Sequence, residues 1–213
     1  MVSNQKLFSV GSFDFRAQHL LVLGILVLTF SLSVIIRAGP LNFDTQLFEY
    51  DPFFNFRATE YLIENGYENY FTWHDEKAWY PFGRDVSDTS QVTLHFAAAF
   101  LYQVFGFGMP LYTFLIYMPL VISAITAIVV FGLVRVLAGT TAGLISSLMF
   151  AITIPLVIRG FAGWFKSEPL GVFLGVLALY FFVSGIKSDN NKISILKLIA
   201  GAFCVTLSIS AWG

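Results

Sequence analysis

Charge and cysteine are both scarce in this sequence. Charged residues make up 12% of the 213 residues, and the chain has one cysteine, Cys204. A soluble domain typically carries about 25% charged residues. Apolar residues make up 57% of the chain and occur in long blocks, which indicates an integral membrane protein. A lone cysteine excludes an internal disulfide and a cysteine-based metal site, so Cys204 is expected to be a small buried side chain.

Five apolar segments are long enough to cross a bilayer as helices, by the criterion of about 20 residues. They cover residues 19–36, 110–134, 141–158, 169–186 and 193–212. The first is interpreted as a retained signal anchor, because it is long for a signal-peptide core and no small-residue cleavage site follows it. We predict a single all-α, polytopic transmembrane domain over residues 1–213, with an external loop at 37–109.

A sixth apolar segment, 92–108, is short and contains His95 and Gln103. If it spans the membrane, the basic cluster from Lys187 to Lys197 falls outside, against the positive-inside rule. If it lies in the interface or re-enters, Arg135 and that cluster fall inside. The acidic loop and residues 159–168 then share the external face. The second topology fits the charge bias better.

Ten of the thirteen acidic residues lie between Asp44 and Asp88, in the loop at 37–109. A long loop rich in carboxylates and aromatic side chains at a bilayer surface suggests a site for a cation or a phosphate. Within it, Asp51 precedes Pro52. The local interpretation is that Asp51 caps a helix and Pro52 is its first residue. One carboxylate oxygen could cap while the other binds a cation.

A second polar segment, residues 159–169, reads RGFAGWFKSEP between two predicted spans. By composition alone, Arg159 and Lys166 are typical of side chains that reach from a helix end to the lipid headgroups. Under the favoured topology, this segment and Asp51 lie on the same membrane face. That proximity makes a joint site with Glu168 possible.

Together these segments resemble the catalytic subunit of oligosaccharyltransferase, which transfers a lipid-linked oligosaccharide to asparagine. The likeness rests on EYDPFFNFRAT at 49–59 and WYPFGR at 79–84, and it extends from about residue 44 to 213. It is greatest to the archaeal and eukaryotic branches. The resemblance implies the N-terminal portion of a C-type, polyprenyl-donor glycosyltransferase fold, with interfacial helices in the external loop.

The resemblance also implies roles for particular residues. Asp51 matches the first carboxylate that binds metal and acceptor, Arg159 a basic residue needed for activity, and Glu168 the second metal ligand. Lys166 stands where the family's second acidic motif has Asp, and a cation cannot ligate a cation. Candidate substrate-binding residues are Lys166, Arg84, Trp79 and Tyr80. Of the two interpretations of Lys166, a contact with the donor's diphosphate, with Glu168 as its partner, is favoured over lipid headgroups.

The implied cofactor is a divalent cation, Mn²⁺ or Mg²⁺. The implied donor is a polyprenyl, dolichyl-type phosphate or diphosphate carrying an oligosaccharide, and the implied acceptor is a protein with Asn-x-Ser/Thr. The bilayer is the other partner, and no nucleic acid is expected. The location would be the cell membrane in an archaeon or the endoplasmic reticulum membrane in a eukaryote. The apolar end at Gly213 indicates an N-terminal fragment that would be inactive alone.

Three alternatives remain at this point. Other polyprenyl-phosphate-sugar glycosyltransferases also place acidic residues in their first external loop. A transporter would carry ionisable residues within its spans, whereas the carboxylates here lie outside them. A non-catalytic membrane subunit would account for Lys166 in place of a metal ligand.

Overall fold

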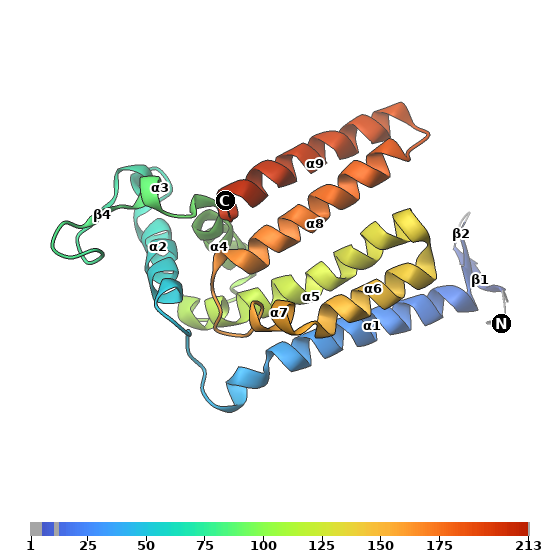
Figure 1. Cartoon of the computed structure of the whole chain (residues 1–213), viewed down its shortest axis with the longest axis horizontal. Coiled ribbons are helices and arrows are strands. Elements are labelled where there is room, and N and C mark those ends of the chain that lie inside the picture. Colours follow the sequence, from blue (N-terminus) through green and yellow to red (C-terminus); the bar gives the residue numbers. More distant parts are fainter. Residues whose placement is uncertain (1–5, 11–12, 213) are drawn as a thin grey trace.

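The computed structural model describes residues 6–10 and 13–212; Gly213 lies outside the described residues. Long helices pack side by side along most of the molecule (Figure 1). They are α1 (Ala17–Arg37), α5 (Leu111–Ala138), α8 (Ser167–Ile186) and α9 (Asn191–Ala211). Two shorter helices, α6 (Thr140–Ile152) and α7 (Ile154–Ile158), return the chain between α5 and α8. A strand pair, β1 (Lys6–Val10) with β2 (Phe13–Arg16), precedes α1.

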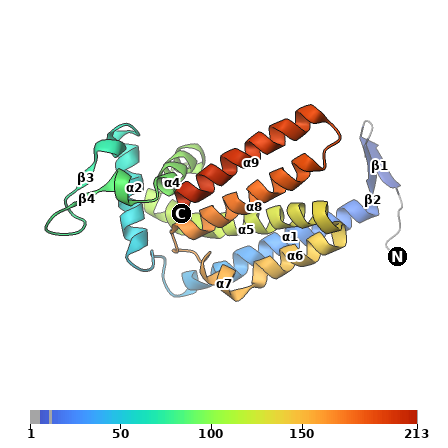
Figure 2. The same cartoon turned by 45° about the horizontal axis from the view of Figure 1, so that its top comes forward.

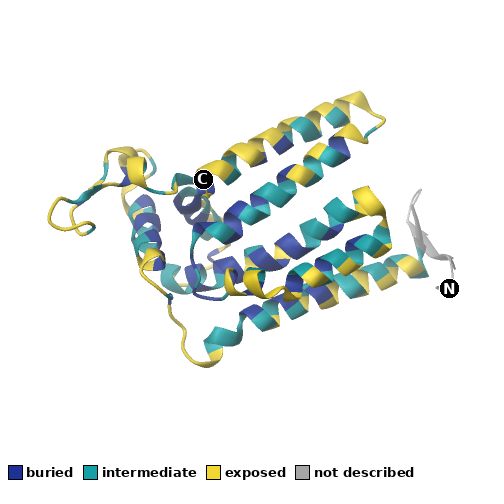
Figure 3. Cartoon of the chain, in the orientation of Figure 1, coloured by how far each residue is buried: buried dark blue, intermediate teal, exposed yellow. Residues whose placement is uncertain are grey.

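The four long helices each have the length and apolar character of a membrane span. Large apolar side chains face outward along them, on α1 for example at Leu20, Leu21, Leu23, Val27, Leu28 and Ile35. Figure 3 shows exposed positions along the outer faces of α1 and α9, and buried ones where α5 and α8 meet. An apolar outer surface of this extent is expected for contact with lipid. The chain is a multi-pass integral membrane protein.

The predicted helix over 141–158 is wrong as a single element, because it breaks at Thr153 between α6 and α7. Pro155 lacks a backbone N–H, and its ring excludes the carbonyl of Ala151 from helical bonding. Arg37, fully buried at the end of α1, donates to that carbonyl at 2.8 Å and to the carbonyl of Leu156 at 3.3 Å. The break is therefore satisfied from a neighbouring helix.

The segment between α1 and α5 forms a cap of short elements at one end of the bundle (Figure 2). The elements are η1 (Gly39–Asn42), α2 (Asp51–Asn65), η2 (Asn69–Thr72), β3 (His74–Asp75), β4 (Arg84–Asp85), α3 (Val86–Thr89) and α4 (Val92–Phe105). Helix α2 buries Asn55, Ala58, Thr59 and Leu62, a spacing of three and four residues, and packs on α4. With 14 residues, α4 is about 21 Å long, less than the hydrocarbon thickness of about 30 Å.

The two ends of the bundle differ in charge as the sequence predicted. Asp51 and Lys166 meet at one end, with an oxygen–nitrogen distance of 3.1 Å. At the other end, Lys187 Nζ donates to the carbonyl of Val136 at 2.7 Å, close to Arg135. The prediction that the acidic loop and residues 159–168 share one end is confirmed. Which end faces the cytoplasm stays a prediction.

Candidate functional site

The site begins at the first turn of α2. The expectation that Asp51 caps this helix is wrong: Tyr50 occupies the N-cap position, Asp51 is the first helical residue, and no side-chain cap bond forms. The Asp51 carboxylate is consequently free to face across the site.

Backbone contacts bring this turn together with the segment before α8. The N–H of Phe48 donates to the carbonyl of Gly163 at 3.1 Å, and the N–H of Gly163 donates to the carbonyl of Ile116 on α5 at 2.9 Å. Asn55 Nδ2 donates to the carbonyl of Phe165 at 3.0 Å. Residues separated by more than 100 positions in the chain are thereby fixed beside each other.

Two sets of ion pairs fill the space between these segments. Lys166 Nζ binds the carboxylate of Glu49 and lies 3.1 Å from Asp51 Oδ2. Arg159 binds Glu168. The expectation that Glu168 pairs with Lys166 is therefore wrong, because Arg159 binds Glu168 while Glu49 and Asp51 contact Lys166.

Lys166 is held on a third side by the ring of Trp164, whose centroid lies 4.7 Å from Nζ. The face of an indole ring attracts a cation. Burial alone would lower the pKa of Lys166, but the hydrogen bonds and charges of Glu49 and Asp51 outweigh it and raise the pKa. The lysine is thus a stable ammonium, and its side chain is only 15% exposed.

A polar pocket opens over these groups beside an apolar groove. Asp51, Asn55, Arg84, Lys166, Glu168 and Trp212 are among the residues that line the pocket. Phe150, Pro155, Val172 and Trp212 line the groove together with Arg159 and Glu168. Because Glu168 and Trp212 border both, the two spaces are adjacent. Such a pair suits an amphiphile with an anionic head and a long apolar chain.

Arg84 is the one member of the WYPFGR segment that the structure brings to the pocket. Its guanidinium lies 4.0 Å from the Phe54 ring centroid and 4.7 Å from that of Trp79, and Nε donates to Thr89 Oγ1 at 2.8 Å. Trp79 is 61% exposed and Tyr80 90% exposed. These two aromatic residues lie on the loop between β3 and β4, which projects from the molecule in Figure 1.

Sequence reasoning missed Glu49 as a member of the site. Its backbone has a φ of +68°, a left-handed conformation that is uncommon for a residue with a side chain. This turn places Glu49 and Asp51 on the same ammonium group. The only signal in the sequence was the spacing of the two carboxylates, two residues apart before Pro52.

A buried hydrogen-bonded chain behind the pocket was also missed. The carbonyl oxygen of Asn55 faces His95 Nε2 at 3.0 Å, and His95 Nδ1 faces the Tyr70 hydroxyl at 2.6 Å. Because the Asn55 oxygen can only accept, neutral His95 carries its proton on Nε2 and accepts from Tyr70. Burial, with a smaller effect of the Arg84 charge, lowers the pKa of His95 to about 3.

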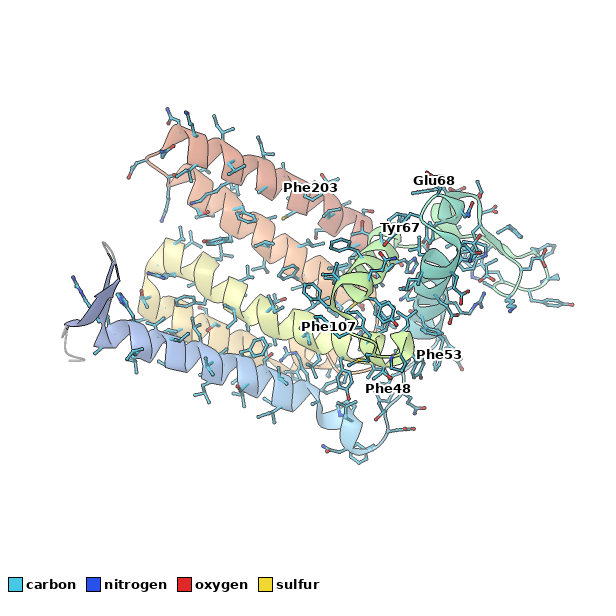
Figure 4. All side chains as sticks on the ribbon, turned by 180° about the vertical axis from the view of Figure 1, so that it is seen from behind. Phe48, Phe53, Tyr67, Glu68, Phe107 and Phe203 are labelled. Carbon is cyan, nitrogen blue, oxygen red and sulfur yellow. The ribbon has the colours of Figure 1, made fainter. Side chains whose placement is uncertain are left out.

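Aromatic side chains are also numerous at this end of the bundle. Figure 4 shows Phe48, Phe53 and Phe107 at the end of the bundle that carries the pocket, and Phe203 on α9 away from it. Phe107 is 90% exposed and Phe53 is 47% exposed. Exposed aromatic rings at the end of a helical bundle are typical of the membrane interface.

The residues present do not fit a divalent cation. Mg²⁺ needs near-ideal octahedral oxygen ligation and is usually held by one or two carboxylates. Here the Asp51 carboxylate contacts an ammonium and the Glu168 carboxylate a guanidinium. Among the described residues, no three His, Cys, Asp or Glu side chains are grouped so that they could hold a metal.

Comparison with known proteins gives consistent results. Residues 21–213 match the family described as oligosaccharyl transferase STT3, N-terminal. The dolichyl-diphosphooligosaccharide–protein glycosyltransferase subunit STT3B of Arabidopsis thaliana is 29% identical over 99% of this chain and 29% of its own length. The subunit STT3 of Saccharomyces cerevisiae is 28% identical over 92% of this chain and 27% of its own length.

A similar fold occurs in the archaeal oligosaccharyltransferase AglB from Archaeoglobus fulgidus, solved in complex with an inhibitory peptide and a dolichol-phosphate. The TM-score is 0.73 and the identity 19%, over 92% of this chain and 24% of that one. This chain therefore spans less than a third of the length of the relatives it matches.

Proposed function

Because this chain belongs to the oligosaccharyl transferase STT3 N-terminal family, we propose that it supplies the donor-side half of a glycosyl-transfer site. The donor would be a polyprenyl, dolichyl-type phosphate or diphosphate that carries an oligosaccharide. The acceptor would be the asparagine amide of an Asn-x-Ser/Thr sequence in a protein. The observation that carries the proposal is the polar pocket bordered by Asp51, Lys166 and Glu168, next to the apolar groove.

The two spaces match the two parts of such a donor. An isoprenoid chain is apolar and suits the groove lined by Phe150, Pro155 and Val172. A phosphate head is anionic and suits the pocket, where Lys166 and Arg84 contribute cationic groups. Glu168 and Trp212 would then lie beside the junction between head and chain.

In the transfer, the bond between the sugar C1 and the phosphate oxygen breaks, and its electron pair stays on the phosphate. The amide nitrogen of the acceptor forms the new bond to C1 and loses a proton, which would pass to the Asp51 carboxylate and from there to water. Lys166, in the polar pocket, and Arg159, bound to Glu168 at its border, would stabilise the negative charge that develops on the leaving phosphate. Asp51 is 73% exposed and accessible to the amide, for which it would accept a hydrogen bond.

A Mn²⁺ or Mg²⁺ ion bound by Asp51 and Glu168 stays a prediction drawn from the resemblance. The ion pairs of both carboxylates oppose it, so no step above depends on it. Trp79 and Tyr80 likewise stay predictions as substrate-binding residues, since both are exposed outside the pocket.

Asp51→Asn in the complete protein tests the proposed function. The substitution keeps the volume and removes the charge, and Asp51 makes no cap bond whose loss would affect α2. We expect transfer to a fluorescent Asn-x-Thr peptide to fall by at least about a hundredfold, the order of a general-base or orienting contribution. Binding of a polyprenyl phosphate should persist.

Asp44→Asn is the matched control, because Asp44 is an exposed carboxylate that accepts a hydrogen bond from the neighbouring N–H of Thr45. It should leave transfer unchanged. Wild-type transfer rates in a folded Asp51→Asn protein would remove Asp51 from the site and leave the proposed chemistry without its acceptor-binding group.

A further inference from the structure

We propose that the Lys166 ammonium is a built-in cation that takes the place of a divalent metal in this site. The role of the ammonium in catalysis rests on the proposed function. Its position between carboxylates rests on the geometry alone. The family resemblance implies a metal-ligating Asp at position 166. The structure places there a cation that is itself bound by carboxylates.

The surroundings of the ammonium are those of a bound cation. Glu49, just before α2, and Asp51, the first residue of α2, approach Nζ, and Trp164 presents its ring at 4.7 Å. Lys166 precedes Ser167, the first residue of α8. The Asn55 bond to the adjacent carbonyl of Phe165 holds the backbone there. A lysine that reached for lipid headgroups would point away from these groups.

Charge balance supports the same conclusion. The pocket and its ion pairs contain three carboxylates, on Glu49, Asp51 and Glu168, and three cationic groups, on Arg84, Lys166 and Arg159. A dipositive ion added to this set would lie next to the Lys166 ammonium and would have to displace it from Asp51. Like charges at such short range disfavour that exchange.

An ammonium can perform part of the work of a metal in the proposed reaction. It donates hydrogen bonds to phosphate oxygens and offsets their charge as the leaving group departs. Three N–H donors allow it to keep Asp51 in position while it contacts the donor. The site would then work without an added divalent cation and without the pH-dependent ligand deprotonation that metal binding requires.

Mn²⁺ binding tests the inference independently of glycosyl transfer. Free aqueous Mn²⁺ gives an electron paramagnetic resonance signal that is lost when the ion binds to protein. We expect the purified wild-type protein to leave the signal unchanged. Lys166→Asp should raise the Mn²⁺ affinity at least about tenfold, and Lys166→Asp combined with Asp51→Asn should return it to the wild-type level.

Lys192→Asp is the control for charge, since Lys192 is exposed at the opposite end of the bundle. It should not create Mn²⁺ binding. Lys166→Met is a second variant that keeps the side-chain length and adds no repulsion; it should bind Mn²⁺ more tightly than wild type and less tightly than Lys166→Asp. Circular dichroism establishes that each variant is folded.

Mn²⁺ binding by the wild type that Asp51→Asn abolishes would overturn the inference. So would folded Lys166→Asp and Lys166→Met proteins that bind no more Mn²⁺ than wild type. Transfer by wild type that persists in excess chelator supports it further. Absence of transfer with or without metal would instead count against the proposed function, while the Mn²⁺ measurement still decides the role of Lys166.

Discussion

Gly163 is the residue on which the two halves of the site depend most directly. Its φ is +86°, and a Cβ there would lie 2.3 Å from the carbonyl oxygen of Gln46 and 2.7 Å from the Phe48 ring. Its carbonyl accepts the Phe48 N–H, which orients the turn that carries Glu49. A glycine is therefore required both by the backbone conformation and by the close approach of the acidic loop.

We expect Gly163→Ala to separate the two segments and to lower stability and transfer together. An alanine with positive φ costs about 1–2 kcal/mol, and the contact with Gln46 adds to this because a backbone atom must move. Gly66→Ala is the matched control, since Gly66 has the same φ of +86° with open space around its Cβ position.

The measurement is the thermal unfolding midpoint of each variant in detergent, together with transfer activity. Gly66→Ala should be destabilised only by the strain of alanine at positive φ, and it should retain transfer. If both variants shift the midpoint equally and both retain transfer, the contact between Gly163 and the acidic loop does not organise the site.

At the scale of elements, the chain of Tyr70, His95 and Asn55 connects η2, α4 and α2 to the carbonyl of Phe165 before α8. All three side chains are buried, so each hydrogen bond matters to the position of α2. Protonated His95 would direct a second N–H at the Tyr70 hydroxyl. It would also carry a charge with no carboxylate partner in this chain of hydrogen bonds. The network therefore requires neutral histidine.

This requirement predicts an acid-sensitive cap. The pKa of His95 falls from 6.5 to about 3 on burial, so the unfolded state binds a proton that the folded state does not. The stability due to neutral His95 is present above pH 6.5 and decreases as the pH falls from there towards 3. His74 acts in the opposite direction, because its hydrogen bond to Asp85 raises its pKa.

Unfolding midpoints at about pH 7 and about pH 5 test this prediction in wild type, His95→Gln and His74→Gln. The drop between the two pH values should be smaller in His95→Gln than in wild type. In His74→Gln the drop should be larger, because the variant lacks a histidine whose protonation stabilises the folded state. An identical drop in His95→Gln and wild type would show that His95 is not held neutral.

At the scale of the whole molecule, the long apolar runs and the charge bias were sufficient to locate the long helices and to place Asp51 and Glu168 at one end. The length of an apolar run and the charge of a loop are properties of one segment, so they can be read from sequence. The break at Thr153 was missed because 141–158 forms one continuous apolar segment. The carbonyl of Ala151, left free by Pro155, is satisfied by Arg37 of α1, which is adjacent in space but 114 residues away in the chain.

The partner of Lys166 could not be read from sequence for a different reason. Glu49 lies 117 residues away, and it reaches Lys166 only because its own φ is positive and Phe48 is bound to Gly163. Glu168 is nearer to Lys166 along the chain, but it forms its ion pair with Arg159. Side-chain pairing across a fold depends on such details of the backbone, which neither composition nor periodicity contains.

The orientation of the bundle in the membrane is the remaining whole-molecule prediction. Arg135 and Lys187 lie at one end and the acidic loop lies at the other, so the positive-inside rule places the pocket outside. Single cysteines at Thr45 and Asp88 should react with a membrane-impermeant maleimide in intact cells. Single cysteines at Arg135 and Asp189 should react only after permeabilisation.

All four positions are exposed, so burial does not limit the reaction. Position 163 is unsuitable as a probe, because a side chain there would disturb the site it reports on. Cys204 is buried on α9 and is replaced by alanine in the background. Labelling of Arg135→Cys from outside would reverse the orientation. The pocket would then face the cytoplasm, where the proposed acceptor would have to be a cytoplasmic polypeptide.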